Sequence, residues 1–337
     1  MRIAINGFGR IGRVFFRQAF GHKGIDVVAI NDLGSVDNLA YLLKYDSVYG
    51  KYDKEVSRKK DDEHHIVVDG KDVRFFQAGD PAKLPWKDLK IDVVVESTGV
   101  FDSFEKASPH LDAGAKSVVI TAPAKDDNAS VTFTPNVGAD LIEKSRITSN
   151  ASCTTNAATP VTAIMMQNPG IKKAVLNTVH GYTATQNLVD GPDKKDFRRG
   201  RAAAVNIVPS STGAADAVIK AAPFMKGKFD GIAMRVPVIS GSLIDFTFVA
   251  SRETSVDEIN DIFRKAARAP EWKGILRVCE EPIVSSDILG EEYGSIVDLA
   301  FTRVVGGDLV KILSWYDNEW GYGAMLLKHV ESLKDYL

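Results

Sequence analysis

The sequence predicts an α/β protein: a Rossmann-type domain with a doubly wound parallel sheet, followed by an α+β domain with a mostly antiparallel or mixed sheet. The first observation is a set of short, continuous apolar runs before residue 150, typical of parallel strands covered on both faces. The second is a glycine-rich turn directly after the first run. The third is a change beyond residue 150 to longer strand patterns with few helices between them.

The first half of the chain alternates between strand and helix patterns. Apolar runs of strand length lie at residues 3–6, 26–31, 92–96 and 117–120. Apolar residues at helical spacing predict helices over 11–19 and 106–113. The stretch 51–72 is charged, and its densest part, 58–63, is expected to be a solvated excursion.

The second half of the chain has longer strand patterns and fewer helix patterns. Strand patterns lie at residues 174–179, 231–237, 243–250, 295–302 and 310–316. A capping box at 254–258 opens one structural helix, and residues 320–337 are helical again. The boundary between the domains falls near Asn150, without a Gly/Ser linker. We therefore expect a second domain that begins at residue 151.

Length and composition limit the function. The chain has 337 residues, 45% hydrophobic and 26% charged, as in ordinary globular proteins of about two domains. Its formal net charge of -2 gives no bulk attraction to nucleic acid or to an acidic membrane. Two distant cysteines, no leader pattern and no apolar run of membrane-spanning length predict a cytoplasmic protein. No His/Cys/carboxylate cluster has metal-ligand spacing, so no metal is expected.

A glycine turn follows the first strand. Gly7, Gly9 and Gly12 form a GxGxxG pattern that ends a strand and opens a helix, where a pyrophosphate is held by backbone N–H groups. Asp32, at the end of the next strand, suits the ribose hydroxyls and repels a 2′-phosphate. The pattern therefore predicts NAD in preference to NADP. The alternative is a phosphate-free turn whose aspartate caps the next segment.

One of the two cysteines lies where a strand gives way to a helix. Cys153 follows Ser152 in the run SNASCTTN, and Pro160 suits the first turn of the helix beyond. A helix N-terminus stabilises a thiolate through its dipole and its unpaired N–H groups. Cys153 is therefore a candidate nucleophile, with a buried free cysteine as the alternative reading.

A histidine downstream is the candidate base. His180 follows a strand and precedes a polar segment, so it is able to take the proton of Cys153 or to pair with the thiolate. A structural histidine at a strand end is the alternative. The other five histidines have charged or helical surroundings that indicate surface positions: His22, His64, His65, His110 and His329.

A second anion site is predicted at Pro209–Ala215, where small hydroxyl residues and a glycine precede a helix. Simple N-capping by Thr212 is the alternative. Together with Arg235, the two helix starts suggest a substrate with one phosphate and a second phosphate bound nearby. The basic run 194–201 has no aromatic-stacking pattern, which favours a solvated or subunit-interface loop over nucleic-acid binding.

In this order, the motifs resemble the phosphorylating glyceraldehyde-3-phosphate dehydrogenase family over essentially the whole chain. The matching runs are NGFGRIGR at 6–13, ND at 31–32, LLKYDS at 42–47, ESTGVF at 96–101, SNASCTTN at 149–156, TATQ and VDGP within 183–192, PSSTGAA at 209–215 and SWYDNEWGY at 314–322. The resemblance implies a Rossmann domain of residues 1–150 completed by 318–337, a catalytic domain over 151–317, and a homotetramer.

The resemblance also implies roles for particular residues. Cys153 would be the nucleophile and His180 its activating partner. Substrate or inorganic phosphate would contact Ser152, Thr154, Thr212 and Gly213, and the other phosphate would contact Thr183 and Arg235. The NAD site would be lined by Arg10, Ile11, Asp32 and Thr121, with Asn318 at the nicotinamide carboxamide.

The implied reaction converts glyceraldehyde 3-phosphate, phosphate and NAD to 1,3-bisphosphoglycerate and NADH through a thioester on Cys153, a step of glycolysis and gluconeogenesis. Three alternatives stay open: an erythrose-4-phosphate dehydrogenase, a non-catalytic nucleotide-binding protein on the same fold, and a cysteine hydrolase. The last leaves the glycine turn and Asp32 without a purpose.

Overall fold

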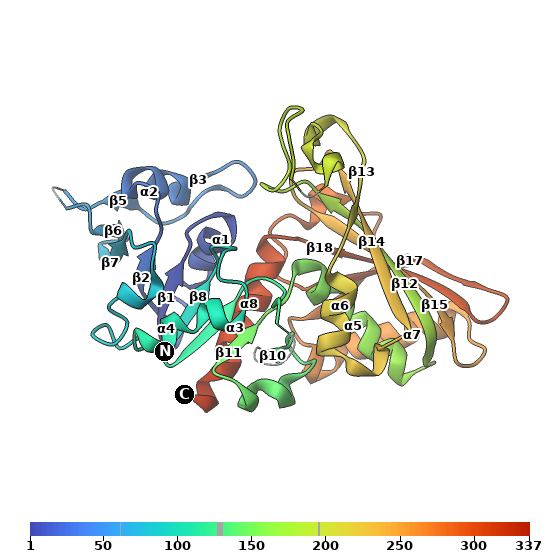
Figure 1. Ribbon diagram of the computed structural model, residues 1–337. Coiled ribbons are helices and arrows are strands. Elements are labelled where there is room, and N and C mark those ends of the chain that lie inside the picture. Colours follow the sequence, from blue (N-terminus) through green and yellow to red (C-terminus); the bar gives the residue numbers. More distant parts are fainter. Residues whose placement is uncertain (61, 127–130, 195) are drawn as a thin grey trace. The chain divides into compact units, whose positions relative to one another are not determined.

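The computed structural model describes residues 1–60, 62–126, 131–194 and 196–337 and contains two compact units (Figure 1). The first unit comprises Met1–Phe133, Ala139–Ala151 and Leu326–Leu337. The second comprises Thr134–Gly138 and Ser152–Met325. The predicted fold class, a Rossmann-type sheet followed by a mixed sheet, is confirmed.

The first unit is built on a mostly parallel sheet. Within the described residues its strands have the order β10-β11-β9-β8-β1-β2-β7-β6-β5. Their bounds are β1 Arg2–Asn6, β2 Asp26–Asn31, β5 Val56–Arg58, β6 His65–Val68, β7 Lys71–Phe76, β8 Val93–Glu96, β9 Ser117–Ile120, β10 Val131–Thr132 and β11 Ile147–Ser149. All pairings from β10 to β7 are parallel, and the chain order reverses beside β1, where such sheets bind ligands.

Both faces of this sheet are covered, which explains its continuous apolar strands. Ile3 and Ile5 of β1 pack into one core with Phe15 of α1 (Arg10–Ala19). Ala4, on the opposite face, packs into another core with Trp86. The remaining helices of this unit are α2 Val36–Lys44, α3 Phe104–Ala107, α4 Pro109–Asp112 and the 3-10 turns η1 Pro81–Lys83, η2 Ala139–Lys144 and η8 Leu333–Tyr336.

The charged stretch 51–72 contains the antiparallel edge of the sheet, and the described residues of its densest part, 58–63, form the mostly exposed turn between β5 and β6, as expected. β5 and β6 pair antiparallel, as do β6 and β7. Val56, Ile66 and Val68 are buried against α2, and in β7 the charged residues Asp72 and Arg74 are exposed on either side of the buried Val73. Of the densest part, residue 61 lies outside the described residues. A short hairpin, β3 Tyr45–Asp46 and β4 Gly50–Lys51, precedes this edge.

The second unit is a mixed, mainly antiparallel sheet with the order β13-β14-β12-β15-β18-β17-β16 among the described residues. Its strands are β12 Ile171–Gly181, β13 Val208–Ser211, β14 Phe229–Val236, β15 Ser242–Ala250, β16 Leu276–Cys279, β17 Ser295–Val305 and β18 Leu309–Tyr316. Two pairings, β12 with β14 and β16 with β17, are parallel and the others antiparallel.

Helices cover one face of this second sheet (Figure 1). They are α5 Cys153–Gln167, α6 Ala214–Ala221 and α7 Val256–Arg268. The 3-10 turns are η3 Phe197–Gly200, η4 Ala203–Val205, η5 Pro223–Met225, η6 Pro270–Trp272 and η7 Ser285–Ile288. In α8 (Trp320–Ser332), Met325 belongs to the core of the second unit and Leu326 to that of the first. No helix in the described ranges is long and apolar enough to cross a membrane.

Two helix predictions need correction. The helix expected over 106–113 is broken into α3 and α4 at Ser108–Pro109, because proline has no N–H for the preceding turn. α5 begins at Cys153, so Pro160 lies well inside the helix rather than in its first turn. Ser152, which has extended backbone angles, accepts the N–H of Thr155 and caps the helix at the earlier position.

Candidate active site

Cys153 is the first residue of α5. Its position is fixed from both sides: Ala151 adopts a left-handed backbone conformation with φ of 53°, and Ser152 caps the helix. A positive φ in a residue with a Cβ is unusual and is held only where the surroundings enforce it. The turn thereby presents the thiol at the helix N-terminus, as the sequence predicts.

The structure brings Cys153 and His180 together. The Sγ of Cys153 lies 3.3 Å from Nε2 of His180, which is near the end of β12 and only 4% exposed. The two residues are 27 positions apart in the chain and come from a helix and a strand. This contact is what a nucleophile and its proton partner require.

Arg235 completes this group from the neighbouring strand. β12 and β14 pair in parallel with His180 opposite Arg235. One guanidinium nitrogen lies 2.6 Å from Nδ1 of His180 and donates to the carbonyl oxygen of Gly181 at 3.1 Å. Nδ1 of His180 also lies 2.6 Å from the Gly181 carbonyl oxygen, so its two neighbours favour opposite tautomers: the arginine needs an acceptor at Nδ1, and the carbonyl needs a donor there.

Burial sets the charge state of this group. Burial, followed by the nearby Arg235 cation, lowers the pKa of His180 to about 3. Burial raises the pKa of the Cys153 thiol to about 11, although Arg235 and hydrogen bonds from Thr154 act in the opposite direction. The expectation of a lowered thiol pKa is therefore wrong for the unliganded chain, because the loss of water outweighs the helix N-terminus.

Two residues that the sequence did not single out, Tyr316 and Thr178, lie beside the Cys153–His180 pair. The hydroxyl of Tyr316 lies 2.8 Å from the hydroxyls of both Thr154 and Thr178. The Tyr316 ring meets the His180 ring edge-on, with centroids 6.0 Å apart. Tyr316 lies at the end of β18 and within the SWYDNEWGY run. No local sequence pattern identifies the hydroxyl groups that its own hydroxyl contacts.

The second predicted anion site lies at the start of α6. Gly213 is the N-cap residue and makes no side-chain cap bond, whereas Thr212 Oγ1 accepts the N–H of Ala214 at 3.1 Å. The preceding strand β13 pairs with β14, which carries Arg235. The hydroxyl of Thr183 pairs with that of Thr185 at 2.9 Å.

The basic run 194–201 contributes one partly buried contact. Arg199 donates to the Ser210 hydroxyl of β13 at 3.1 Å. Arg201 pairs with Asp190 at the surface. Lys195 lies outside the described residues. This pattern fits a folded loop on the protein rather than a free basic surface.

The glycine turn of the first unit has the shape of a cradle. Gly7 has φ of 91°, and a Cβ there would lie 2.5 Å from the backbone nitrogen of Thr98. A Cβ on Gly12 would lie 2.2 Å from the Gly7 carbonyl oxygen, whereas one on Gly9 would meet open space. Gly9 is the N-cap of α1, so the first N–H groups of that helix face this space.

A cavity of about 350 Å³ adjoins this turn. Asp32 lines it, with one carboxylate oxygen accepting the Phe8 N–H at 2.7 Å and the other the Gly34 N–H at 2.8 Å. The other lining residues are Asn6, Gly7, Gly9, Asn31, Leu33, Ala78, Gly79, Ser97, Thr98, Val100 and Phe101. An open glycine at a helix N-terminus and a fixed carboxylate fit the pyrophosphate and ribose of a dinucleotide.

Four predicted cofactor residues of the first unit do not line this cavity: Arg10, Ile11, Gly12 and Thr121. Arg10 pairs with Asp46, and Ile11 lies in the first turn of α1. Thr121 follows β9, and its N–H donates to the Glu96 carbonyl oxygen at 3.0 Å.

Asn318, in the second unit, has a fully engaged carbonyl. Its Oδ1 accepts the Gly241 N–H at 3.0 Å and the Ser242 hydroxyl at 2.9 Å. This leaves its NH₂ group as the donor for a ligand.

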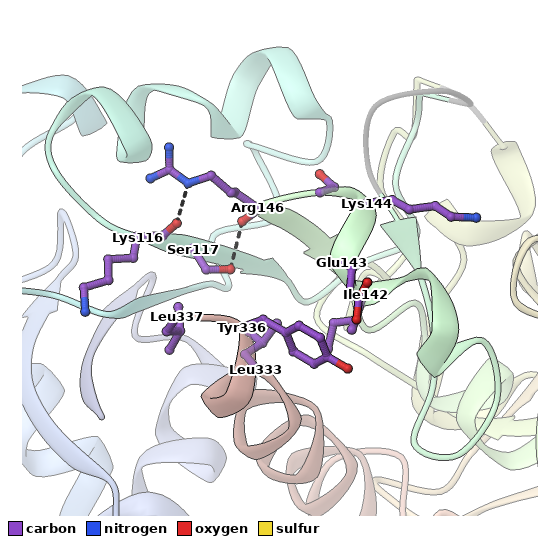
Figure 2. A pocket seen from close by; sticks show the side chains of 10 residues that line it. Lys116, Ser117, Ile142, Glu143, Lys144, Arg146, Leu333, Tyr336 and Leu337 are labelled. Carbon is purple, nitrogen blue, oxygen red and sulfur yellow. Dashed lines mark hydrogen bonds between the residues drawn. The ribbon is translucent and has the colours of Figure 1, made fainter.

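A second hollow, of about 480 Å³, lies elsewhere on the first unit (Figure 2). It is lined by η2, by η8 with Leu337, and by residues around Lys116 and Arg146. Figure 2 shows the side chains of Lys144 and Arg146 pointing in opposite directions. Arg146 uses its guanidinium on the carbonyl oxygens of Lys116 and Ala115. None of the predicted site residues lines this hollow.

Comparison with known proteins agrees with this geometry. Residues 1–104 match the glyceraldehyde 3-phosphate dehydrogenase NAD binding domain, and residues 152–318 match the C-terminal domain of the same family. Glyceraldehyde-3-phosphate dehydrogenase 1 of Candida glabrata is 46% identical over 98% of both chains. The enzyme of Borreliella burgdorferi is 47% identical over 99% of both, and the chloroplastic GAPA1 of Arabidopsis thaliana is 47% identical over 96% of this chain and 81% of its own.

A Rossmann unit joined to a unit with a cysteine–histidine pair defines a dinucleotide-dependent oxidoreductase with a covalent step. The chain belongs to the glyceraldehyde-3-phosphate dehydrogenase family. The predicted family and the NAD cofactor are confirmed.

Proposed function

We propose that the chain oxidises D-glyceraldehyde 3-phosphate with NAD and inorganic phosphate to 1,3-bisphosphoglycerate, through a thioester on Cys153. The observation that carries this proposal is the 3.3 Å contact between the sulfur of Cys153 and Nε2 of His180, with Arg235 against the same imidazole. A nucleophile, a proton carrier and a cation for a phosphate handle thus lie in one group of the second unit.

The covalent chemistry follows from the thiol and the imidazole. The Cys153 thiolate attacks the aldehyde carbon to give a hemithioacetal, and His180 takes up the hydroxyl proton as the carbon–hydrogen bond breaks. NAD, when bound, accepts the hydride. The thioester that remains keeps the acyl group activated. Inorganic phosphate attacks its carbonyl carbon, and the Cys153 thiolate leaves to complete the cycle.

Arg235 links substrate binding to this proton transfer. In the unliganded chain its guanidinium competes with the Gly181 carbonyl oxygen for Nδ1 of His180. A substrate phosphate that pairs with Arg235 would withdraw the guanidinium. The tautomer that donates from Nδ1 to the Gly181 carbonyl oxygen would then be favoured, and in that tautomer Nε2 is the acceptor that catalysis needs.

The second phosphate has its own proposed binding groups. The starts of α5 and α6 supply them through Ser152, Thr154, Thr212 and Gly213. Thr183 would act with Arg235 on the substrate phosphate.

On the first unit, Gly7, Gly9 and Gly12 with Arg10, Ile11 and Thr121 would hold the dinucleotide. The Asp32 carboxylate would bind the ribose and disfavour NADP. On the second unit, the free NH₂ group of Asn318 supports a contact with the nicotinamide carboxamide.

The test is NADH formation by the purified chain, measured with and without phosphate and with two aldehydes. We expect phosphate-dependent turnover with glyceraldehyde 3-phosphate, and little with erythrose 4-phosphate. Preference for erythrose 4-phosphate would make the chain the alternative dehydrogenase. NAD binding without turnover of either aldehyde would identify a non-catalytic nucleotide-binding protein.

A homotetramer in the cytoplasm is the proposed state. Apolar side chains stand exposed in the loop after β12, where Leu188 is 78% and Phe197 87% exposed. Val175 and Ile232 are exposed on the sheet face opposite the helices of the second unit. Exposed apolar patches of this kind favour contact with further copies of the chain. Light scattering tests this, and Phe197→Asp should weaken the assembly; a monomeric wild type would refute it.

A further inference from the structure

A buried polar network lies behind the cavity of the first unit, and it begins at a histidine. The sequence analysis expected His110 on the surface, but it is fully buried in α4. Its Nδ1 accepts the indole N–H of Trp86 at 3.0 Å, and its Nε2 lies 3.0 Å from the carboxylate of Glu96. Because an indole nitrogen only donates, the imidazole proton must reside on Nε2. A neutral His110 therefore donates to Glu96.

Glu96, at the end of β8, is 2% exposed and is held by hydrogen bonds from neutral groups. Its Oε2 accepts the Asn6 amide and the His110 imidazole. Its Oε1 accepts both the backbone N–H and the hydroxyl of Thr98. A buried carboxylate is costly unless its lone pairs are satisfied in this way.

The network extends from Glu96 to four residues that line the cavity. Asn6 accepts the Asn31 amide at 2.7 Å, and Asn31 in turn accepts the Ala78 N–H at 2.8 Å. Asn6, Asn31, Ala78 and Thr98 all line the cavity. They come from the ends of β1 and β2 and from the segments after β7 and β8. One set of hydrogen bonds thus joins four separate stretches of chain at the carboxyl-terminal edge of the sheet.

We propose that Trp86, His110 and Glu96, here called the supporting triad, are positioning residues that keep the NAD cavity preformed. They do not line the cavity themselves; they act through Asn6 and Thr98, which do. A preformed wall spares the cofactor the cost of ordering loops when it binds. The inference rests on the proposed placement of the dinucleotide in this cavity.

The network requires a glutamate at position 96, not merely a side chain of that size. In Glu96→Gln, one oxygen becomes an NH₂ group. Turned toward Thr98, that group opposes the Thr98 N–H; turned the other way, it opposes the donors of Asn6 and His110. His110 is unable to switch its proton to the other nitrogen because Trp86 donates there. Either orientation places donor against donor, so an isosteric change should loosen the walls.

The experiment measures NAD affinity by calorimetry on the full-length chain, with thermal unfolding of the cofactor-free protein alongside. Glu96→Gln and His110→Phe should weaken NAD binding roughly tenfold. His110→Gln, which keeps a donor and an acceptor, should recover part of that affinity. In steady-state assays the KM for NAD should rise by more than kcat falls. Trp86→Phe serves as a further probe if Glu96→Gln does not fold, and should also weaken NAD binding.

His329→Gln is the matched control. His329 is equally buried in the same unit, but its partners Thr148 and Asn150 do not line the cavity. It should lower the unfolding temperature without changing NAD affinity. If the triad variants lose stability like this control and bind NAD as the wild type does, the positioning role is overturned.

Asp32→Ala separates this proposal from the placement of the cofactor. Loss of NAD affinity in Asp32→Ala, with wild-type affinity in the triad variants, refutes the supporting triad alone. Unchanged affinity in Asp32→Ala and in the triad variants refutes the placement of the dinucleotide and the triad with it.

Discussion

His329 should make the stability of the chain depend on pH in a way that one substitution removes. It lies in α8, fully buried, with Nε2 2.8 Å from the Thr148 hydroxyl and Nδ1 3.1 Å from the Asn150 side-chain oxygen. Its ring packs on Phe133 with centroids 3.8 Å apart. Burial lowers the pKa of His329 from 6.5 to about 3.

The sign and size follow from proton linkage. Below pH 6.5 the unfolded chain binds a proton at His329, while the folded chain does not until about pH 3. Stability is therefore complete above the unfolded pKa and is lost as the pH falls. At pH 5, one and a half units below 6.5, this loss amounts to about 2 kcal/mol. Between pH 7.5 and 8 the same group contributes almost no slope.

Urea unfolding of the wild type and of His329→Gln at pH 7.5 and pH 5 measures the difference. The variant should be less stable at pH 7.5, because it loses packing and hydrogen bonds. Its further loss on going to pH 5 should be smaller than that of the wild type by about 2 kcal/mol. His64→Gln, at an exposed position, controls for the removal of a histidine and should keep the wild-type slope. Equal losses in the wild type and His329→Gln would refute the reasoning.

Three further predictions concern the proposed active site and cofactor site. Cys153→Ser should bind NAD with unchanged affinity and lose nearly all oxidation of the aldehyde; wild-type turnover would exclude the thioester. His180→Asn should slow alkylation of Cys153 by iodoacetamide at neutral pH, since the Nε2 donor that favours the thiolate is gone, and an unaltered rate would remove its activating role. Asp32→Ala should raise the affinity for NADP relative to NAD, and an unchanged ratio in cofactor titrations would show that another group reads the ribose.

Much of the fold was predictable because its signals are local. Apolar runs before residue 150 correspond to β1, β2, β8 and β9, and the glycine turn lies between β1 and α1 as expected. The antiparallel edge at 56–76 escaped prediction because its strands are short and carry charges on the exposed face. Their burial depends on α2, which lies at residues 36–44 and gives no signal within the edge itself.

The buried histidines show where local patterns fail. His110 and His329 have charged or helical neighbours in the sequence, which predicted surface positions. Each is buried because a distant residue supplies a polar partner: Trp86 for His110 and Thr148 for His329. A single sequence does not give such pairings, since the partners lie 24 and 181 residues away.

The candidate active site depends both on local sequence signals and on pairings between residues far apart in the chain. The helix start identifies Cys153 from its neighbours, but its partner depends on strand register: β12 sets His180 opposite Arg235 of β14. Shifting that register by one residue would turn Arg235 to the other face of the sheet and remove the cation from His180. Sheet pairing therefore adds the Arg235 cation to the burial that lowers the pKa of His180. In the proposed reaction, a substrate phosphate would pair with Arg235 and so withdraw this cation from His180.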